Sequence, residues 1–152
     1  MTLLLQLLLA AGLVLIDQAV KQLVLTYLAP IGRTPIIENV LYLLYHENTG
    51  AAFGILQNNT LVLGILSAVI SAGIIWMLAK KQVPGKYLPW CAAVALGGAL
   101  GNMIDRLLRG FVVDYIYFSP INFPVFNFAD ICLTCSLFAI IIDVLFIEKG
   151  LA

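Results

Sequence analysis

The chain has 152 residues, of which 62% are hydrophobic and only 11% are charged, and its mean hydropathy is +1.05. A soluble domain is usually about half apolar and about a quarter charged, so this composition excludes a soluble enzyme and a disordered chain. Eight basic residues balance eight acidic ones, which excludes binding to nucleic acid through net charge. We therefore expect a small integral membrane protein with a single domain, residues 1–152.

Four apolar segments are long enough to cross about 30 Å of hydrocarbon as helices. They cover residues 3–27, 60–79, 88–107 and 128–147. The first begins like the apolar region of a signal peptide, but no basic residue precedes it and the apolar pattern continues beyond Asp17. We interpret it as a retained span. The expected fold class is an all-α integral membrane protein with four transmembrane helices.

The basic residues predict how these helices are oriented. The loop between the second and third segments carries three lysines, Lys80, Lys81 and Lys86. Such an excess marks a cytoplasmic loop, so both termini are predicted to be cytoplasmic. The connections 28–59 and 108–127 then face outward. Three arginines on the predicted outer side count against this orientation: Arg33, Arg106 and Arg109.

The two outer connections contain more than plain linkers. Residues 36–45 and 111–118 are rich in Ile, Val, Tyr and Phe, which favours short strands. Tyrosines in and near these segments are typical of the aromatic belt at a membrane surface. Four prolines interrupt the connections, at Pro30, Pro35, Pro120 and Pro124. We expect a small extracytoplasmic β-sheet and loop region that rests on the outer membrane surface.

Small residues in the third segment predict close helix packing. Ala93, Gly97 and Gly101 recur at every fourth position, a spacing that allows two membrane helices to approach each other. The glycines from Gly98 to Gly101 follow no strand and open no helix, which excludes a dinucleotide-binding loop.

Polar residues gather at one membrane depth, near the predicted outer surface. They are Asp17 and Lys21 in the first segment, Asn48 in the first outer connection, Asn102, Asp105 and Arg106 at the end of the third segment, and Asp114, Asn127 and Asp130 around the second connection. Asp143 follows Asp130 by 13 residues, about 20 Å along a helix, and is placed at the cytoplasmic side. This convergence predicts a functional site near the outer surface.

Each of these polar residues also has an ordinary structural interpretation. Asp17 and Lys21 are spaced i,i+4 and can form an ion pair on one helix face. Asp130 can cap a helix, Asp114 can be an exposed loop residue, and Arg106 can reach the lipid headgroups. A proton-coupled small transporter or channel subunit is the alternative function, although it predicts acidic residues spread through the membrane. A non-catalytic scaffold is a third possibility.

Cysteine and histidine offer little chemistry in this sequence. Cys91, Cys132 and Cys135 all lie in apolar segments, so we expect no disulfide framework and buried packing for the Cys132-x-x-Cys135 pair. His46 is the only histidine, which excludes a zinc site built on several imidazoles. We expect no metal and no other cofactor.

Two aspartates are the best candidates for catalysis. Two neighbouring carboxyl groups cannot both ionise cheaply, so they share one proton. The ionised group can activate a water that attacks an amide carbonyl, while the protonated group polarises that carbonyl. Asp114 and Asp130 flank a short connection that contains two prolines and can bring both to one point. We expect Asp130, near a helix start, to favour its charged form and Asp114 to resist ionisation.

Five motifs carry a resemblance to a known family. They read Asp17-Gln-Ala-Val-Lys21, Asn48-Thr-Gly-Ala-Ala-Phe53, Gly97-Gly-Ala-Leu-Gly-Asn-Met-Ile-Asp-Arg106, Val113-Asp114 and Phe126-Asn-Phe-Ala-Asp130. In this order, around four apolar segments, they resemble the bacterial lipoprotein signal peptidases (signal peptidase II) over nearly the whole chain. The resemblance implies an intramembrane aspartyl endopeptidase. It would cleave a prolipoprotein just before a cysteine that carries a diacylglyceryl group and so release the signal peptide.

The resemblance also implies a role for each motif residue, with Asp114 and Asp130 as the catalytic pair. Residues that would support the site or contact substrate are Asn48, Gly50, Asn102, Arg106 and Asn127. Residues with a structural role would be Asp17, Lys21 and Asp105. The implied partners are a lipidated prolipoprotein, membrane lipid and inhibitors of the globomycin type. The implied location is the bacterial inner membrane, with several spans and the site near the extracytoplasmic face.

Overall fold

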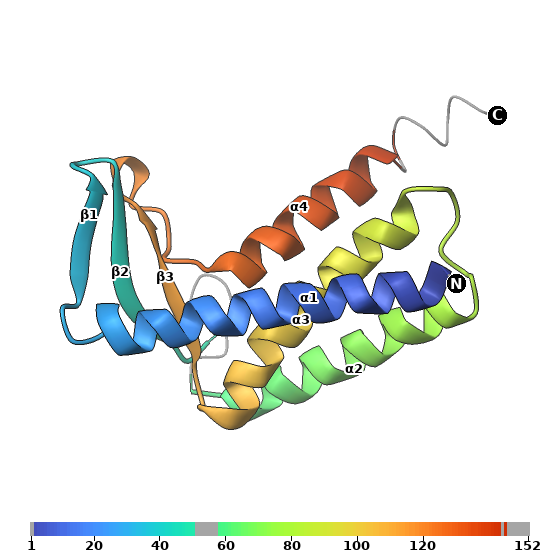
Figure 1. The fold of residues 1–152 in the computed structure, drawn as a ribbon, viewed down its shortest axis with the longest axis horizontal. Helices are drawn as coiled ribbons and strands as arrows, with labels where there is room; N and C mark the ends of the chain where they lie inside the picture. Colours follow the sequence, from blue (N-terminus) through green and yellow to red (C-terminus); the bar gives the residue numbers. More distant parts are fainter. Residues whose placement is uncertain (1, 51–57, 144, 146–152) are drawn as a thin grey trace.

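The computed structural model describes residues 2–50, 58–143 and 145 of the chain. The long helices of this part are α1 (Thr2–Leu23), α2 (Thr60–Ala79), α3 (Leu88–Leu108) and α4 (Phe128–Ile142). A π-helical turn, η1 (Val24–Leu28), continues α1. Figure 1 shows α1, α2 and α3 side by side, with α4 leaning away from them and a sheet at one end.

Three helical segments are long and apolar enough to cross a membrane: Thr2–Leu28, Thr60–Ala79 and Leu88–Leu108. They correspond to the first three predicted spans, so the prediction of a multi-pass membrane protein is confirmed. The fourth apolar helix, α4, has 15 residues. Its predicted span, 128–147, runs on into residues outside the described part of the chain, so the fourth span stays a prediction.

Glycines allow α3 to pack closely against both α1 and α4. A Cβ atom added at Gly97 would lie 2.9 Å from the nearest side-chain carbon of α1, and one added at Gly101 would lie 2.6 Å from Asp17 Oδ2. One added at Gly98 would lie 2.5 Å from the backbone oxygen of Ala129 in α4. These distances are shorter than any normal contact. The predicted close packing of the third helix is therefore confirmed, and Gly98 extends it to a second neighbour.

A three-stranded antiparallel sheet follows the order β1-β2-β3, with β1 (Arg33–Ile37), β2 (Leu41–Asn48) and β3 (Val112–Phe118). The prediction of a strand over 111–118 matches β3 to within one residue. The predicted strand segment 36–45 instead contains a turn between β1 and β2. Asn39 adopts a φ of 62° in this turn, a left-handed conformation that asparagine tolerates better than most residues.

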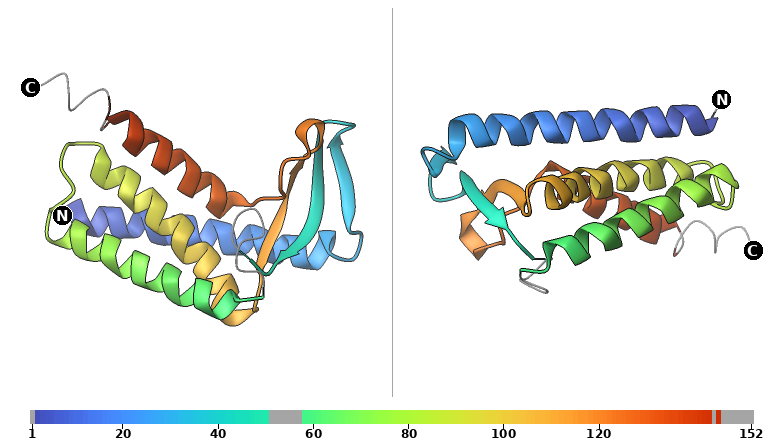
Figure 2. Two further views of the ribbon diagram at one scale, coloured as in Figure 1. Left: turned by 180° about the vertical axis from the view of Figure 1, so that it is seen from behind. Right: turned by 90° about the horizontal axis from the view of Figure 1, so that it is seen from below.

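The sheet packs on the end of α1 that lies away from the amino terminus (Figure 2). Val24 and Leu28 of the helical turn form a small core there with Val113 and Tyr115 of β3. Because successive side chains of a strand point to opposite faces, Asp114 points away from this core. The alternation along β3 therefore directs Asp114 back toward the ends of α3 and α4.

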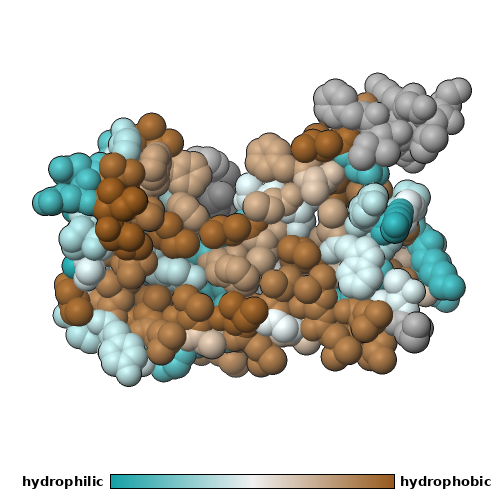
Figure 3. Space-filling view, turned by 45° about the horizontal axis from the view of Figure 1, so that its top comes forward, coloured by the Kyte–Doolittle hydropathy of each residue, from teal (hydrophilic) through white to brown (hydrophobic). Residues whose placement is uncertain are grey.

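Large apolar side chains cover the outside of the helices. Leu61, Val62, Ile65 and Val69 of α2 are each more than half exposed, and α2 carries no charged residue. Figure 3 shows hydrophobic residues across the middle of one face, with hydrophilic residues gathered toward its two ends. Such a surface is unfavourable in water but is the surface that the hydrocarbon of a bilayer requires.

Candidate functional site

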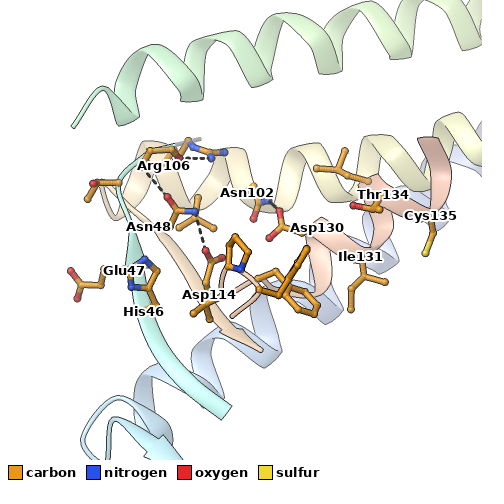
Figure 4. A pocket seen from close by; sticks show the side chains of 18 residues that line it. His46, Glu47, Asn48, Asn102, Arg106, Asp114, Asp130, Ile131, Thr134 and Cys135 are labelled. Carbon is orange, nitrogen blue, oxygen red and sulfur yellow. Dashed lines mark hydrogen bonds between the residues drawn. The ribbon is translucent and has the colours of Figure 1, made fainter. Parts of the chain in front are cut away.

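A cavity of about 990 Å³ opens where β2, β3 and the adjoining ends of α3 and α4 meet (Figure 4). Its polar wall includes Asn48, Asn102, Arg106, Asp114 and Asp130. Its apolar wall includes Val112, Phe123, Val125, Phe126, Ile131 and Leu133. These five polar residues, which the sequence analysis placed at one membrane depth, thus line one cavity although they come from different elements.

Asp130 and Asn127 lie at the start of α4 and form a capping box. The backbone N–H of Asp130 donates to Asn127 Oδ1 at 3.0 Å, and that of Asn127 donates to Asp130 Oδ2 at 3.1 Å. The N–H of Ala129 donates to Asp17 Oδ1 at 3.2 Å. Asp130 therefore caps its helix, as the ordinary interpretation expected, and the same hydrogen bonds fix its carboxyl group beside the cavity.

Asp114 is 1% exposed, and both of its carboxyl oxygens accept hydrogen bonds from amides. Asn127 Nδ2 donates to Oδ1 at 2.6 Å, and Asn48 Nδ2 donates to Oδ2 at 3.0 Å. Burial raises the pKa of Asp114 to about 7, with a further contribution from the charge of Asp130, against the lowering effect of the two amide donors. This pKa agrees with the expectation that Asp114 resists ionisation. The alternative interpretation, an exposed loop residue, is wrong because Asp114 is buried.

Asn102 holds the second carboxyl group. Its Nδ2 donates to Asp130 Oδ1 at 2.7 Å. Its Oδ1 accepts hydrogen bonds from Lys21 Nζ at 2.9 Å and from Asn127 Nδ2 at 3.2 Å. Since an ammonium group can only donate, the oxygen of the amide must face Lys21, and the amide nitrogen is therefore directed at Asp130.

Asn48, Gly50 and Arg106 form the opposite rim. Asn48 Oδ1 accepts a hydrogen bond from Gly50 N at 3.0 Å, which turns the Asn48 amide nitrogen toward Asp114. Arg106 Nη2 donates to the backbone oxygen of Gly50 at 3.1 Å. Arg106 Nε is buried and has no hydrogen-bond partner among the described residues. The rest of this motif, residues 51–53, lies outside the described part of the chain.

Lys21 is fully buried among charged side chains. Its Nζ lies 2.9 Å from Asp17 Oδ2 and 2.9 Å from Asp105 Oδ2, so the predicted Asp17–Lys21 pair is confirmed. Asp105 is also paired with Arg109 and accepts a hydrogen bond from Gln18 Nε2 at 3.1 Å. Two carboxylates and two cations make this network neutral overall, which a membrane interior requires.

Sequence reasoning missed Gln18 and Arg109, although the i,i+4 spacing from Asp105 to Arg109 is itself a signal for a pair. Among the residues that line the cavity, it also missed His46, Glu47, Thr134 and Cys135. Asp143 lies at the far end of α4, as expected.

The three cysteines are free, and Cys132 is buried as predicted. Cys135 is exposed, so the prediction of buried packing is wrong for this residue. Although residues three apart are neighbours on a helix, Cys135 lines the open cavity, whereas Cys132 does not. Within the described ranges, no group of three or more His, Cys, Asp or Glu side chains is placed to hold a metal ion.

Comparisons with known proteins agree with this architecture. The family described as signal peptidase (SPase) II matches residues 9–146. Relatives named lipoprotein signal peptidase include one from Caldanaerobacter subterraneus subsp. tengcongensis, 43% identical over 92% of this chain and 94% of its own length. Another, from Brevibacillus brevis, is 40% identical over 90% of this chain and 92% of its own. A solved bacterial membrane enzyme superimposes with a TM-score of 0.82 at 33% identity, covering 92% of this chain and 87% of its own. The chain therefore belongs to the signal peptidase II family.

Proposed function

We propose that the chain is an intramembrane aspartic endopeptidase that removes the signal peptide from prolipoproteins, cleaving before a cysteine that carries a diacylglyceryl group. The signal peptidase II family and the relatives named lipoprotein signal peptidase support this reaction over the transporter alternative. One observation carries the catalytic type: Asp114 and Asp130 line the same cavity, and Asn127 donates a hydrogen bond to each of them.

The proposed reaction uses one proton shared by the two carboxyl groups. Asp130 takes a proton from a water molecule, and the resulting hydroxide attacks the carbonyl carbon of the scissile peptide bond. Asp114 gives its proton to the carbonyl oxygen, so a neutral tetrahedral intermediate forms. Its collapse breaks the C–N bond, as Asp130 passes its proton to the leaving amine and Asp114 regains one from the hydroxyl group. The pKa of Asp114, about 7, allows this carboxyl group to hold a proton near neutral pH.

The neighbouring polar residues divide into two proposed roles. Asn48, Asn102 and Asn127 hold the two carboxyl groups, because each amide nitrogen donates to one of them. Gly50 and Arg106 shape the rim of the cavity, where substrate would pass. The remaining polar motif residues, Asp17, Lys21 and Asp105, hold α1 and α3 together as a charged network.

The cavity has one polar and one apolar wall, which suits a substrate that is part peptide and part lipid. A diacylated cysteine keeps its peptide bond at the depth of the lipid headgroups, and its acyl chains stay in the hydrocarbon. Ile131 and Leu133 of α4 give the cavity an apolar side along the helix. We propose that the signal peptide enters from the lipid along this side, and that globomycin-type inhibitors occupy the same cavity.

The proposed topology is a single membrane domain of four spans with both termini in the cytoplasm of a bacterium. The chain would lie in the inner membrane, with the cavity near the extracytoplasmic face. The lysine-rich loop between α2 and α3 supports this orientation, because basic loops are retained on the cytoplasmic side. The sheet lies at the other end of the helices (Figure 1), and the strands β2 and β3 contribute residues to the lining of the cavity.

Aspartate variants test the catalytic assignment directly. Asp114→Asn and Asp130→Asn should each lower the cleavage rate of a purified diacylglyceryl-modified precursor by at least about 10³-fold, since each removes one of the two proton-transfer groups. Asp143→Asn is the matched control, because Asp143 is an aspartate at the far end of α4, and its activity should stay near normal. Near-normal turnover by either of the first two variants would exclude the aspartic mechanism. The melting temperature in detergent checks that each variant is folded.

A further inference from the structure

A second cavity, of about 460 Å³, has a lining that shares no residue with the first. It is formed where the start of α1 meets the end of α2 and the loop that leads to α3. Its lining includes Thr2 and Gln6 of α1, Leu78 of α2, and Lys81 and Val83 of the loop. We call it the α1 cavity. Nothing in the proposed reaction uses it.

Gln6 is an unusual residue for this position. It is only 4% exposed, it lines the α1 cavity, and its side chain makes no hydrogen bond to another described residue. The amide atoms of Gln6 are not among the fully buried polar atoms without a partner, so they reach the open space of the cavity that Gln6 lines. The cavity therefore presents a polar group that a bound molecule would satisfy.

Among the described residues that line the α1 cavity, the one charged side chain is that of a lysine. Lys81 lines it, and Lys80 and Lys86 belong to the same loop. No acidic residue occurs between Glu47 and Asp105 or in residues 2–16, and none of the three lysines forms an ion pair with a described residue. The first N–H groups of α1 add partial positive charge, since the first turn of a helix leaves its N–H groups without partners inside the helix. The α1 cavity therefore favours an anion.

Exposed aromatic side chains place the α1 cavity at the level of the lipid headgroups. Trp76 of α2 is 54% exposed, Tyr87 just before α3 is 64% exposed, and Trp90 in the first turn of α3 is 37% exposed. Tryptophan and tyrosine collect at the boundary between hydrocarbon and water. An anion at this depth is most readily supplied by the membrane itself.

We propose that the α1 cavity binds the phosphate group of an anionic phospholipid in the leaflet opposite the catalytic cavity. The Gln6 amide nitrogen and the first-turn N–H groups of α1 donate hydrogen bonds to the phosphate oxygens, and Lys81 supplies the countercharge. Leu78 and Val83 contact the start of the acyl chains. Inorganic phosphate offers the same chemistry to the polar groups but not to the apolar ones.

Native mass spectrometry of the full chain in detergent, with phosphatidylglycerol or phosphatidylcholine added, tests this proposal. Phosphatidylglycerol should bind more tightly than phosphatidylcholine. Lys81→Gln should weaken phosphatidylglycerol binding about fivefold, the effect of one basic residue near an anionic headgroup. Lys80→Gln is the matched control: it removes the same charge from the neighbouring residue, and should change the affinity less than about twofold. Gln6→Leu should also weaken binding while keeping the side-chain volume.

Four results would overturn the proposal. Equal losses in Lys80→Gln and Lys81→Gln would mean that a diffuse surface charge attracts the lipid. Unchanged affinity in Gln6→Leu, or no preference for phosphatidylglycerol, would mean that the α1 cavity is not the site. Binding of inorganic phosphate can be measured by the shift that it causes in the melting temperature of the protein. If phosphate alone binds as tightly as the lipid, the α1 cavity is a site for a free anion. Cleavage activity should be unchanged in all three variants, because none of these residues lies near the catalytic cavity.

Discussion

Lys21 is the residue that joins the charged network to the proposed catalytic pair. Its ammonium group contacts one oxygen each of Asp17, Asp105 and Asn102, all at 2.9 Å. Because it occupies the oxygen of the Asn102 amide, it directs the nitrogen of that amide at Asp130. One buried cation thus pairs with two carboxylates and also orients a hydrogen-bond donor in the site.

Replacing Lys21 by Met should lower the free energy of unfolding by about 3–5 kcal/mol, because Asp17 and Asp105 then lose a buried partner. The cleavage rate of the folded fraction should also fall, since the Asn102 amide is free to turn away from Asp130. Melting temperature and kcat, measured in detergent, report the two effects separately. Lys86→Met is the control, because Lys86 is exposed and should change stability by less than about 0.5 kcal/mol. A Lys21→Met variant as stable as the parent would contradict this account of the network.

The pKa of Asp114 predicts how activity depends on pH. This carboxyl group must hold a proton in the proposed reaction, and its pKa is about 7, so kcat/KM should decline as pH rises through about 7. The hydrogen bond from Asn48 lowers this pKa. Asn48→Ala removes that donor and should therefore move the decline to higher pH. A decline at unchanged pH in Asn48→Ala would mean that Asp114 is not the group that titrates.

The same group should influence stability with a defined sign. Between pH about 4, where an aspartate of the unfolded chain ionises, and pH about 7, folded Asp114 keeps a proton that the unfolded chain has lost. The folded state then binds more protons, so the contribution of Asp114 to stability falls as pH rises through this interval. The melting temperature of Asp114→Asn should accordingly fall less between pH 5 and pH 8 than that of the parent. An equal fall in both proteins would contradict the raised pKa.

At the scale of elements, the start of α4 is held by other parts of the chain. The N–H groups of Phe128 and Ala129 donate to the Tyr115 hydroxyl and to Asp17 Oδ1, each at 3.2 Å. The next N–H, that of Asp130, is used by the capping box. A helix start normally leaves such groups to water. Here β3 and α1 bind them instead, which fixes where α4 begins and so where the carboxyl group of Asp130 lies.

The contact between α3 and α4 should not tolerate a methyl group. In Gly98→Ala, the added Cβ would lie 2.5 Å from the backbone oxygen of Ala129, so the two helices must separate. We expect a loss of about 1–3 kcal/mol and a lower cleavage rate, because Ala129 adjoins Asp130. The matched control is Gly73→Ala in α2, where nothing lies within 4 Å of the added atom. Since alanine favours a helix over glycine, its melting temperature should not fall. Equal melting temperatures for the two variants would show that the contact between α3 and α4 accommodates the added methyl group, which would contradict this prediction.

At the scale of the whole molecule, the two ends of the helices differ in chemistry. One end carries the sheet and the proposed catalytic cavity with its carboxyl groups, and the other carries the lysine-rich loop and the α1 cavity. Apolar side chains cover the helices between them (Figure 3). This distribution suits a protein that faces both sides of a membrane with opposite chemistry.

Single cysteines can test which end faces outward. In a variant without the three native cysteines, Glu38→Cys in the turn of the sheet should react with a membrane-impermeant maleimide in intact spheroplasts. Gln82→Cys in the loop between α2 and α3 should react only after lysis, because the proposed orientation places this lysine-rich loop in the cytoplasm. Both residues are exposed, so access to reagent differs only by side. Labelling of Gln82→Cys in intact spheroplasts would reverse the proposed orientation.

Local patterns in the sequence predict local structure well. The helical segment 2–28 differs from its predicted range by one residue at each end, since hydropathy depends only on neighbouring residues. The Asp17–Lys21 pair follows from spacing on one helix. The turn at Asn39 was missed because the residues around it all favour strands, and a hairpin differs from one long strand by few residues.

The sequence by itself determined that this chain enters a membrane, which residues are polar within it, and which family it resembles. Only the tertiary structure decided how those polar residues are paired. It shows that Asn127 donates to Asp114, that Lys21 orients Asn102, and that Cys135 lines a cavity. Such contacts join residues far apart in the chain, and their geometry depends on how closely glycine lets the helices approach. No local period or spacing carries that information.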